Sequence, residues 1–153
     1  MRLNLFNYDE PARPIAGDDG VILRGLDDAE WRSLLEFVER QRFPGGARIL
    51  RMGESDRTLY ILQSGEVDVV VEAPGQLKVI ATIGAGSVFG ELAFFDGAPR
   101  MASIYATEDC ELLALSQPAF MKLSAWHPRI ARELLFDLGR VLSARLRRAQ
   151  SRN

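Results

Sequence analysis

The chain has 153 residues, of which 47% are hydrophobic and 26% are charged, and its formal net charge at pH 7 is -2. This composition is ordinary for a soluble globular domain with a hydrophobic core, and the slightly negative charge argues against a protein that coats nucleic acid. No apolar run approaches the roughly 18 residues of a membrane span, and the N-terminus has acidic and turn residues where a signal peptide needs a long apolar stretch, so we expect a cytoplasmic protein without a membrane span.

The first part of the chain divides into an unpatterned segment and a helix. Residues 1–26 contain prolines and glycines with little periodicity, which predicts an extended N-terminal segment without visible chemistry. Residues 27–41 predict an amphipathic helix, because four apolar residues recur at spacings of i, i+3, i+4 and i+7. These residues are Trp31, Leu34, Leu35 and Val38. Asp27 and Glu30 have the spacing of a capping box at the start of this helix.

Residues 42–116 consist of short apolar or alternating runs separated by turn signals. The turn signals are Pro44-Gly45-Gly46, Gly53-Glu54, Ser64-Gly65, Pro74-Gly75 and Gly84-Ala85-Gly86. Such a pattern predicts an antiparallel sandwich or barrel. The only cysteine, Cys110, excludes internal disulfides and a multi-cysteine iron–sulfur site, and its place in a strand-like run predicts a role in core packing.

Beyond Ser116 the pattern becomes helical again. It predicts helices over residues 117–126 and from 129 to about 150, separated by a break at His127-Pro128. The second helix carries a broad apolar stripe, which consists of Ile130, Leu134, Leu135, Leu138, Val141, Leu142 and Leu146. A stripe of this width allows the helix to pack on the sheet and also on a second copy of itself, whereas a helix that covers only its own core is an equal alternative.

The end of this helix is basic, because no acidic residue follows Asp137. The arginines in this region are Arg140, Arg145, Arg147, Arg148 and Arg152. They would either contact a phosphate backbone or a membrane surface, or complement the negative dipole end of a solvated helix. The second interpretation is favoured, because arginine is the usual cation throughout the chain.

Residues 89–103 are the most specific stretch of the chain. Gly90 allows the backbone to approach a ligand, and the apolar residues after it predict a short helix whose free N–H groups suit an anion. Arg100 supplies a planar guanidinium that matches two phosphate oxygens. Glu91 would repel a phosphate, so its partner is expected to be a hydroxyl, such as that of a ribose. The alternative is a salt bridge between Glu91 and Arg100 without a ligand.

This stretch resembles the phosphate-binding cassette of the cyclic nucleotide-binding domain family. Upstream, Gly53-Glu54, the run Leu59-Tyr60-Ile61-Leu62 and Gly65 resemble the family's first signature, so the resemblance covers about residues 27–150. It implies a mostly β fold, an antiparallel β-roll of the jelly-roll-like, double-stranded β-helix type, over about residues 42–116. An N-terminal helix and C-terminal helices at about 117–150 would flank the roll and complete a domain over residues 27–153.

The resemblance also implies roles for individual residues. Gly90, Leu92 and Ala102 would donate backbone N–H groups to the ligand. Glu91 would bind the ribose 2′-hydroxyl, and Arg100 would bind the cyclic phosphate. Met101 lies beside the phosphate position where the family usually has Ser, Ala or Thr, and its thioether cannot donate a hydrogen bond, which bears on affinity. Asp56 is a second departure, because the first signature has a small residue there.

We therefore predict a regulatory sensor that binds a 3′,5′-cyclic purine nucleotide and converts occupancy into movement of the final helix. Cyclic AMP is the expected ligand because the threonine that often accompanies guanine preference is absent at Met101, and cyclic GMP is the alternative. No paired acid and base groups, metal-ligand set or other cofactor site emerges, so we do not expect an enzyme.

The family resemblance also implies that the last helix closes over the base and forms the seam of a homodimer. A competing hypothesis is a degenerate fold that serves dimerisation or docking without ligand. DNA binding is not expected, because no segment follows Asn153 that would form a helix-turn-helix. With no effector visible in the sequence, three alternatives stay open: the domain acts on a separate effector protein, belongs to a longer protein, or buffers its ligand.

Overall fold

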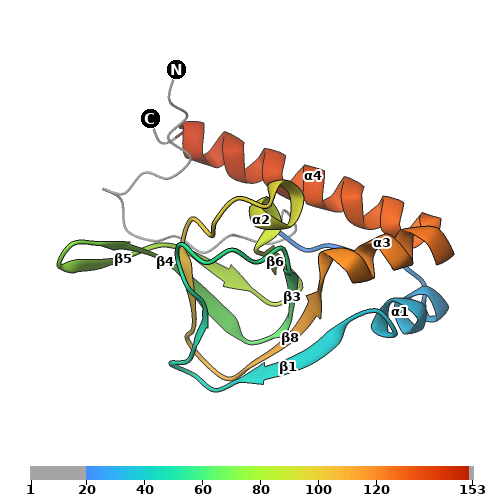
Figure 1. Cartoon of the computed structure of the whole chain (residues 1–153), viewed down its shortest axis with the longest axis horizontal. Coiled ribbons are helices and arrows are strands. Elements are labelled where there is room, and N and C mark those ends of the chain that lie inside the picture. The colour runs from blue at the N-terminus through green and yellow to red at the C-terminus, as the bar shows by residue number, and fades with distance from the viewer. Residues whose placement is uncertain (1–19, 152–153) are drawn as a thin grey trace.

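The structure is a computed structural model that describes residues 20–151. Within this range, strands form two four-stranded sheets with the orders β1-β8-β3-β6 and β2-β7-β4-β5, and every pairing between strands is antiparallel. The strands are β1 (Glu39–Phe43), β2 (Arg48–Leu50), β3 (Leu59–Ser64), β4 (Glu66–Ala73), β5 (Gln76–Gly84), β6 (Val88–Phe89), β7 (Ser103–Ala106) and β8 (Cys110–Leu115). The predicted β-roll with flanking helices is confirmed (Figure 1).

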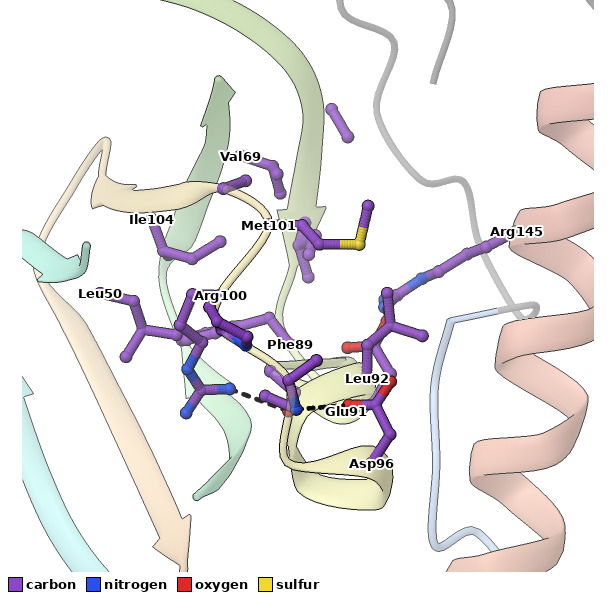
Figure 2. Close-up of a pocket in the computed structure, with 17 residues that line it drawn as sticks. Leu50, Val69, Phe89, Glu91, Leu92, Asp96, Arg100, Met101, Ile104 and Arg145 are labelled. Atoms are coloured by element: carbon purple, nitrogen blue, oxygen red, sulfur yellow. Dashed lines mark hydrogen bonds and ion pairs between the residues drawn. The ribbon is translucent and has the colours of Figure 1, made fainter. Parts of the chain in front are cut away.

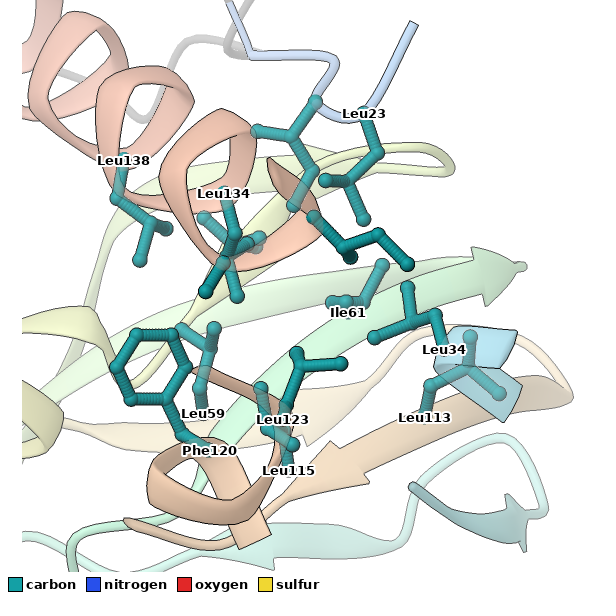
Figure 3. Close-up of a cluster of buried hydrophobic side chains, with 14 of the residues drawn as sticks. Leu23, Leu34, Leu59, Ile61, Leu113, Leu115, Phe120, Leu123, Leu134 and Leu138 are labelled. Atoms are coloured by element: carbon teal, nitrogen blue, oxygen red, sulfur yellow. The ribbon is translucent and has the colours of Figure 1, made fainter. Parts of the chain in front are cut away.

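Two hydrophobic clusters hold this architecture together. One lies inside the roll and is formed by side chains of both sheets, among them Leu62, Val67 and Leu112, with Cys110 also buried there. The other lies between the first sheet and the helices, where Leu134 and Leu138 pack towards Leu59 and Ile61 (Figure 3). The roll therefore has a core of its own, and a second core attaches the helices to one of its sheets.

A single glycine shows how tightly the strands are connected. Gly65 links β3 and β4 with a φ of 95°, a left-handed conformation that residues with a Cβ rarely adopt. A Cβ atom there would lie 2.5 Å from the carbonyl oxygen of Asp109 and 2.7 Å from Cys110 Sγ. The turn signal at Ser64-Gly65 thus marks a position that only glycine fits.

The first helix is shorter than the sequence pattern predicts. Helix α1 covers Asp28–Leu35, and the predicted capping box of Asp27 and Glu30 is present. The predicted extension to residue 41 is wrong, because residues 39–43 form β1 and pair along β8. Pairing with a neighbouring strand satisfies the backbone groups there, and this long-range contact overrides the local helical pattern, whose last apolar member is Val38. The strand region accordingly begins at Glu39 rather than at residue 42.

Three further helices follow the expected pattern. Helix α2 (Glu91–Asp96) lies between β6 and β7. Helix α3 (Gln117–Trp126) follows its N-cap residue Ser116, whose side chain accepts a hydrogen bond from the Ala119 N–H. The predicted break at His127-Pro128 separates α3 from α4 (Pro128–Ser151), which runs along one side of the roll (Figure 1). None of the helices in the described range has the length and apolar character that a membrane crossing requires.

The apolar stripe of α4 divides between the core and the surface. Its core-facing members are Ile130, Leu134, Leu138 and Val141, all of them buried. In contrast, Leu135 is 40% exposed and the neighbouring Phe136 is 75% exposed. Apart from the backbone of its own helix, a Cβ atom on Gly139 would meet no atom of the described residues within 4 Å, so close packing does not require this mid-helix glycine.

A short segment before α1 is part of the folded body. The extended N-terminal segment predicted for residues 1–26 lies mostly outside the described residues, but Ile22, Leu23 and Leu26 are buried in the cluster beneath the helices. The Leu23 N–H donates to Asp137 Oδ2 at 2.6 Å, and Arg140 donates to the carbonyl oxygen of Val21 at 2.6 Å. This segment therefore ties the middle of α4 to the roll.

Candidate functional site

A pocket of about 150 Å³ opens between the inner face of the second sheet, helix α2 and helix α4 (Figure 2). Its apolar lining includes Leu50, Val69, Ala81, Ile83, Phe89 and Ile104. Its remaining lining comes mainly from residues 90–102 and from Arg145 of α4. The predicted site residues all line this pocket, namely Gly90, Glu91, Leu92, Arg100, Met101 and Ala102.

Helix α2 places its N-terminal end in the pocket because of Gly90. This residue has a φ of 80° and lies directly before the helix. A Cβ atom at this position would lie 2.6 Å from Arg100 Nη1 and 3.0 Å from the Thr58 carbonyl oxygen, so a side chain would displace the arginine. The first amides of any α-helix lack intrahelical acceptors. The pocket thus receives free N–H donors beside a guanidinium.

Arg100 is held from inside the roll. Its side chain is only 3% exposed, and it donates to the Gly90 carbonyl oxygen at 3.0 Å and to the Thr58 carbonyl oxygen at 2.8 Å. The same guanidinium forms an ion pair with Asp56 at 3.2 Å. Its Nε atom is buried and has no hydrogen-bond partner among the described residues. Buried donors are normally satisfied, so an acceptor brought by a ligand would suit this group.

Asp56 is the ion-pair partner of Arg100. From the sequence, Asp56 stood out only as a departure from the family's first signature. Burial alone would raise the pKa of Asp56, but hydrogen bonds from Thr58 and the charge of Arg100 outweigh burial and hold that pKa below its ordinary value. Asp56 is therefore ionised at neutral pH and orients the arginine. Its side chain remains 41% exposed, so solvent screens this ion pair in part.

Glu91 is paired with a residue that the sequence did not single out. Its Oε1 atom lies 2.8 Å from Arg145 Nη1, and Arg145 also donates to Ser87 Oγ at 3.2 Å and to the Val88 carbonyl oxygen at 2.8 Å. The Nε atom of Arg145 is buried without a partner among the described residues. Figure 2 shows Arg100 and Arg145 approaching the pocket from opposite sides.

The alternative of a direct salt bridge between Glu91 and Arg100 is wrong about the partners. Each residue is ion-paired, but Glu91 pairs with Arg145 and Arg100 pairs with Asp56. The basic end of α4 was interpreted as a solvated helix end, and that interpretation is wrong for Arg145, which is largely buried against the pocket. Helical spacing could have revealed that Arg145 faces the roll. It follows the core residues Leu138 and Val141 by seven and four positions, so it lies on the same face of α4.

The remaining predicted residues complete one side of the pocket. Met101 is 50% exposed, whereas Leu92 and Ala102 are partly buried. His127, the only histidine, ends α3 and contacts the Phe37 ring edge-on, with ring centroids 5.8 Å apart. The site thus brings together the buried Arg100 guanidinium, the N-terminal end of α2, the Glu91 carboxylate and an apolar wall.

Comparison with known proteins gives a consistent result. Residues 40–126 match the family model described as "Cyclic nucleotide-binding domain". The chain is 33% identical over 129 residues to a cyclic AMP receptor protein of Thermus thermophilus, which covers 84% of this chain and 58% of the relative. It is also 33% identical over 116 residues to a cAMP-dependent protein kinase regulatory subunit of Colletotrichum orbiculare, covering 76% of this chain and 29% of the relative. The chain thus spans less than two thirds of each relative.

Solved structures agree with this match. A cyclic nucleotide-binding domain from Methylobacillus flagellatus superposes with a TM-score of 0.76 at 30% identity, covering 86% of this chain and 75% of the other. The catabolite activator protein of Thermus thermophilus superposes with a TM-score of 0.72 at 33% identity, covering 84% of this chain and 59% of the other. Each similarity covers more than four fifths of this chain.

Proposed function

The chain belongs to the cyclic nucleotide-binding domain family, and from this premise we propose that it is a sensor of a 3′,5′-cyclic purine nucleotide. Cyclic AMP is the expected ligand and cyclic GMP the alternative. The observation that carries the proposal is the buried Arg100 guanidinium, with its unpartnered Nε, beside the N-terminal end of α2. In this mode Arg100 binds the cyclic phosphate, and the backbone N–H groups of Gly90, Leu92 and Ala102 donate to the ligand.

The ligand identity is supported by two lines of reasoning. Position 101 is Met, so the threonine that often accompanies guanine preference in this family is absent. The regulatory domain of Toxoplasma gondii protein kinase A, solved with cAMP, superposes with a TM-score of 0.57 at 29% identity. We therefore place cyclic AMP first. The role is regulatory binding rather than catalysis, as in the family.

Occupancy would reach α4 through the Glu91–Arg145 pair. Arg145 is paired with Glu91 Oε1, so a ribose hydroxyl that donates to Glu91 would share the carboxylate that holds Arg145, and binding would change the contacts that hold the end of α4 on the pocket. The buried half of α4 stays attached, because Leu134 and Leu138 lie in the core. The segment proposed to respond is therefore the part of α4 around and beyond Arg145, which is held by the Arg145 contacts and by the buried Ala149 rather than by the main core cluster.

A homodimer through α4 would carry this movement to a separate effector protein. The exposed Leu135 and Phe136 provide an apolar surface for a second copy, whereas Leu138 is fully buried and faces the core. Phe136→Asp should therefore abolish a dimer without disturbing the core. Light scattering on the wild type and on this variant tests the idea, and a wild type that is monomeric at high concentration would rule the dimer out.

One observation favours a second candidate function, a docking module without ligand. Three charged residues of the pocket, Glu91, Arg100 and Arg145, already have oppositely charged protein partners, and Met101 contributes no hydrogen-bond donor. A pocket whose charges are internally satisfied folds without a ligand.

Titration separates the two candidates. Cyclic AMP at about one hundred times its dissociation constant should stabilise the fold by roughly 2.7 kcal/mol and raise the melting midpoint by a few degrees. Hydrogen exchange in the last turns of α4 should change at the same time, and this change should be absent in Arg145→Gln. No heat and no thermal shift at millimolar cyclic AMP or cyclic GMP would favour the docking module.

A further inference from the structure

Arg57 contacts helix α2 at its C-terminal end, opposite the end that Gly90 begins. It lies in the connection between β2 and β3, and its Nη2 atom donates to the carbonyl oxygen of Phe95 at 2.8 Å and to that of Phe94 at 3.2 Å. These are carbonyls of the last turn of α2. A Cβ atom on Gly97, the residue that ends the helix, would lie 3.4 Å from Arg57 Cδ, so the arginine stem also passes along this turn.

Helix α2 needs such support because it is short. It has six residues, and a helix of this length is marginal by itself, since forming the first turn fixes many dihedral angles for few hydrogen bonds. The last carbonyls of a helix have no intrahelical donor, and a cation beside them is favourable for the helix dipole. Arg57 supplies both the donor and the charge.

The connection between β2 and β3 also holds the N-terminal end of α2. Residues on either side of Arg57 bind Arg100, because Asp56 forms an ion pair with it and the Thr58 carbonyl oxygen accepts from it. Arg100 in turn donates to the Gly90 carbonyl oxygen at the start of α2. Three consecutive residues, 56–58, thus fix the position of both ends of α2 and of the buried guanidinium.

We propose that Arg57 is a positioning residue for ligand binding, which sets the tilt of α2 so that its N-terminal amides and Arg100 meet the same phosphate. The proposal rests on the function proposed above. Arg57 does not line the pocket, so it acts on the ligand only through the helix. Without Arg57, Arg100 stays in place, but the C-terminal end of α2 is no longer held and the helix changes its tilt. The N-terminal amides of α2 then shift relative to Arg100, and a shift of a fraction of an ångström weakens their hydrogen bonds to the phosphate.

The test compares Arg57→Met, Arg57→Lys and the matched control Arg51→Met. Met keeps an apolar stem without donors, and Arg51 is an exposed arginine of the same connection that does not line the pocket, so the two Met variants change the net charge equally. We expect Arg57→Met to weaken cyclic AMP binding about tenfold, Arg57→Lys to lose less, and Arg51→Met to bind as the wild type does. The loss should be the same for 2′-deoxy cyclic AMP, because the phosphate contacts are affected.

Two further measurements distinguish positioning from a general loss of stability. The melting midpoints of the ligand-free Met variants should agree within a few degrees, whereas the amides of α2 should exchange faster in Arg57→Met alone. Wild-type affinity in Arg57→Met, or an equal loss in Arg51→Met, would overturn this inference and leave the proposed function intact. A wild type that binds no cyclic nucleotide would overturn the proposed function and this inference with it.

Discussion

The roll side and the α4 side of the pocket each contribute an arginine, and the two arginines differ in what holds them. Arg100 is fixed largely by backbone carbonyls of Gly90 and Thr58, which belong to the packed framework. Arg145 projects from a helix and depends on the Glu91 carboxylate, the Ser87 hydroxyl and the Val88 carbonyl across an interface between elements. The first arrangement is preorganised, whereas the second is a contact that a ligand can exchange.

In the proposed function, this difference separates recognition of the ligand at Arg100 from the response of α4 at Arg145. A guanidinium that is already in position loses little freedom when an anion arrives, which favours affinity. An ion pair that shares its carboxylate with an incoming hydroxyl changes partner on binding, which favours a conformational response. Under the proposed function, the roll side would therefore hold the phosphate, and the α4 side would report that the pocket is filled.

The largest expected effect tests the roll side. Arg100→Ala should weaken binding by more than the ~1.5–3 kcal/mol of a hydrogen bond to a charged group, because a partly desolvated phosphate is left unpaired. The loss should be equal for cyclic AMP and its 2′-deoxy analogue in calorimetric titrations. A loss below about threefold would show that the roll side does not hold the phosphate.

A double-mutant cycle on Glu91 and Arg145 tests the α4 side. In the ligand-free protein we expect a coupling free energy of about 1–2 kcal/mol in unfolding experiments, since the two residues are in contact and largely buried. With saturating cyclic AMP the coupling should shrink, because Glu91 then serves the ribose hydroxyl. With the 2′-deoxy ligand the affinity loss of Glu91→Ala should nearly vanish, and equal losses on both ligands would instead show that Glu91 supports the loop.

Met101→Ser should increase ligand affinity at the roll side of the pocket without changing the response of α4. The substitution adds a hydroxyl donor beside the expected phosphate position, and one hydrogen bond of about 1 kcal/mol should tighten binding several-fold. Hydrogen exchange in α4 should respond to ligand as in the wild type. If the variant binds no better, the side chain at position 101 does not reach the phosphate.

The smallest expected effect concerns pH. The folded-state pKa of Asp56 lies below its ordinary value, so its ion pair stabilises the fold above about pH 4 and this contribution is lost as pH falls towards the lowered pKa. The side chain is 41% exposed, so we expect less than about 1 kcal/mol. Chemical denaturation between pH 3 and 6 should show a shallower pH dependence for Asp56→Asn, and identical curves would contradict this role.

Much of the fold could be predicted from local patterns. The turn signals, the capping box at Asp27 and the break at His127-Pro128 all depend on residues close together in the chain, and each is present in the structure. The end of α1 could not be predicted in this way, because no turn signal separates the helical pattern from residues 39–41, which pair with β8. The backbone hydrogen bonds of a sheet come from residues far away in the sequence.

The site divides in the same manner. By itself the sequence determined that Gly90, Glu91 and Arg100 gather in one cassette, because a glycine before a short helix and a nearby arginine are local chemistry. Only the tertiary structure decided their partners, since Asp56 is 44 positions from Arg100 and Arg145 is 54 positions from Glu91. A charged side chain in a partly buried pocket takes the opposite charge that packing brings within about 3 Å, and packing of α4 on the roll is decided by the whole core rather than by any one segment.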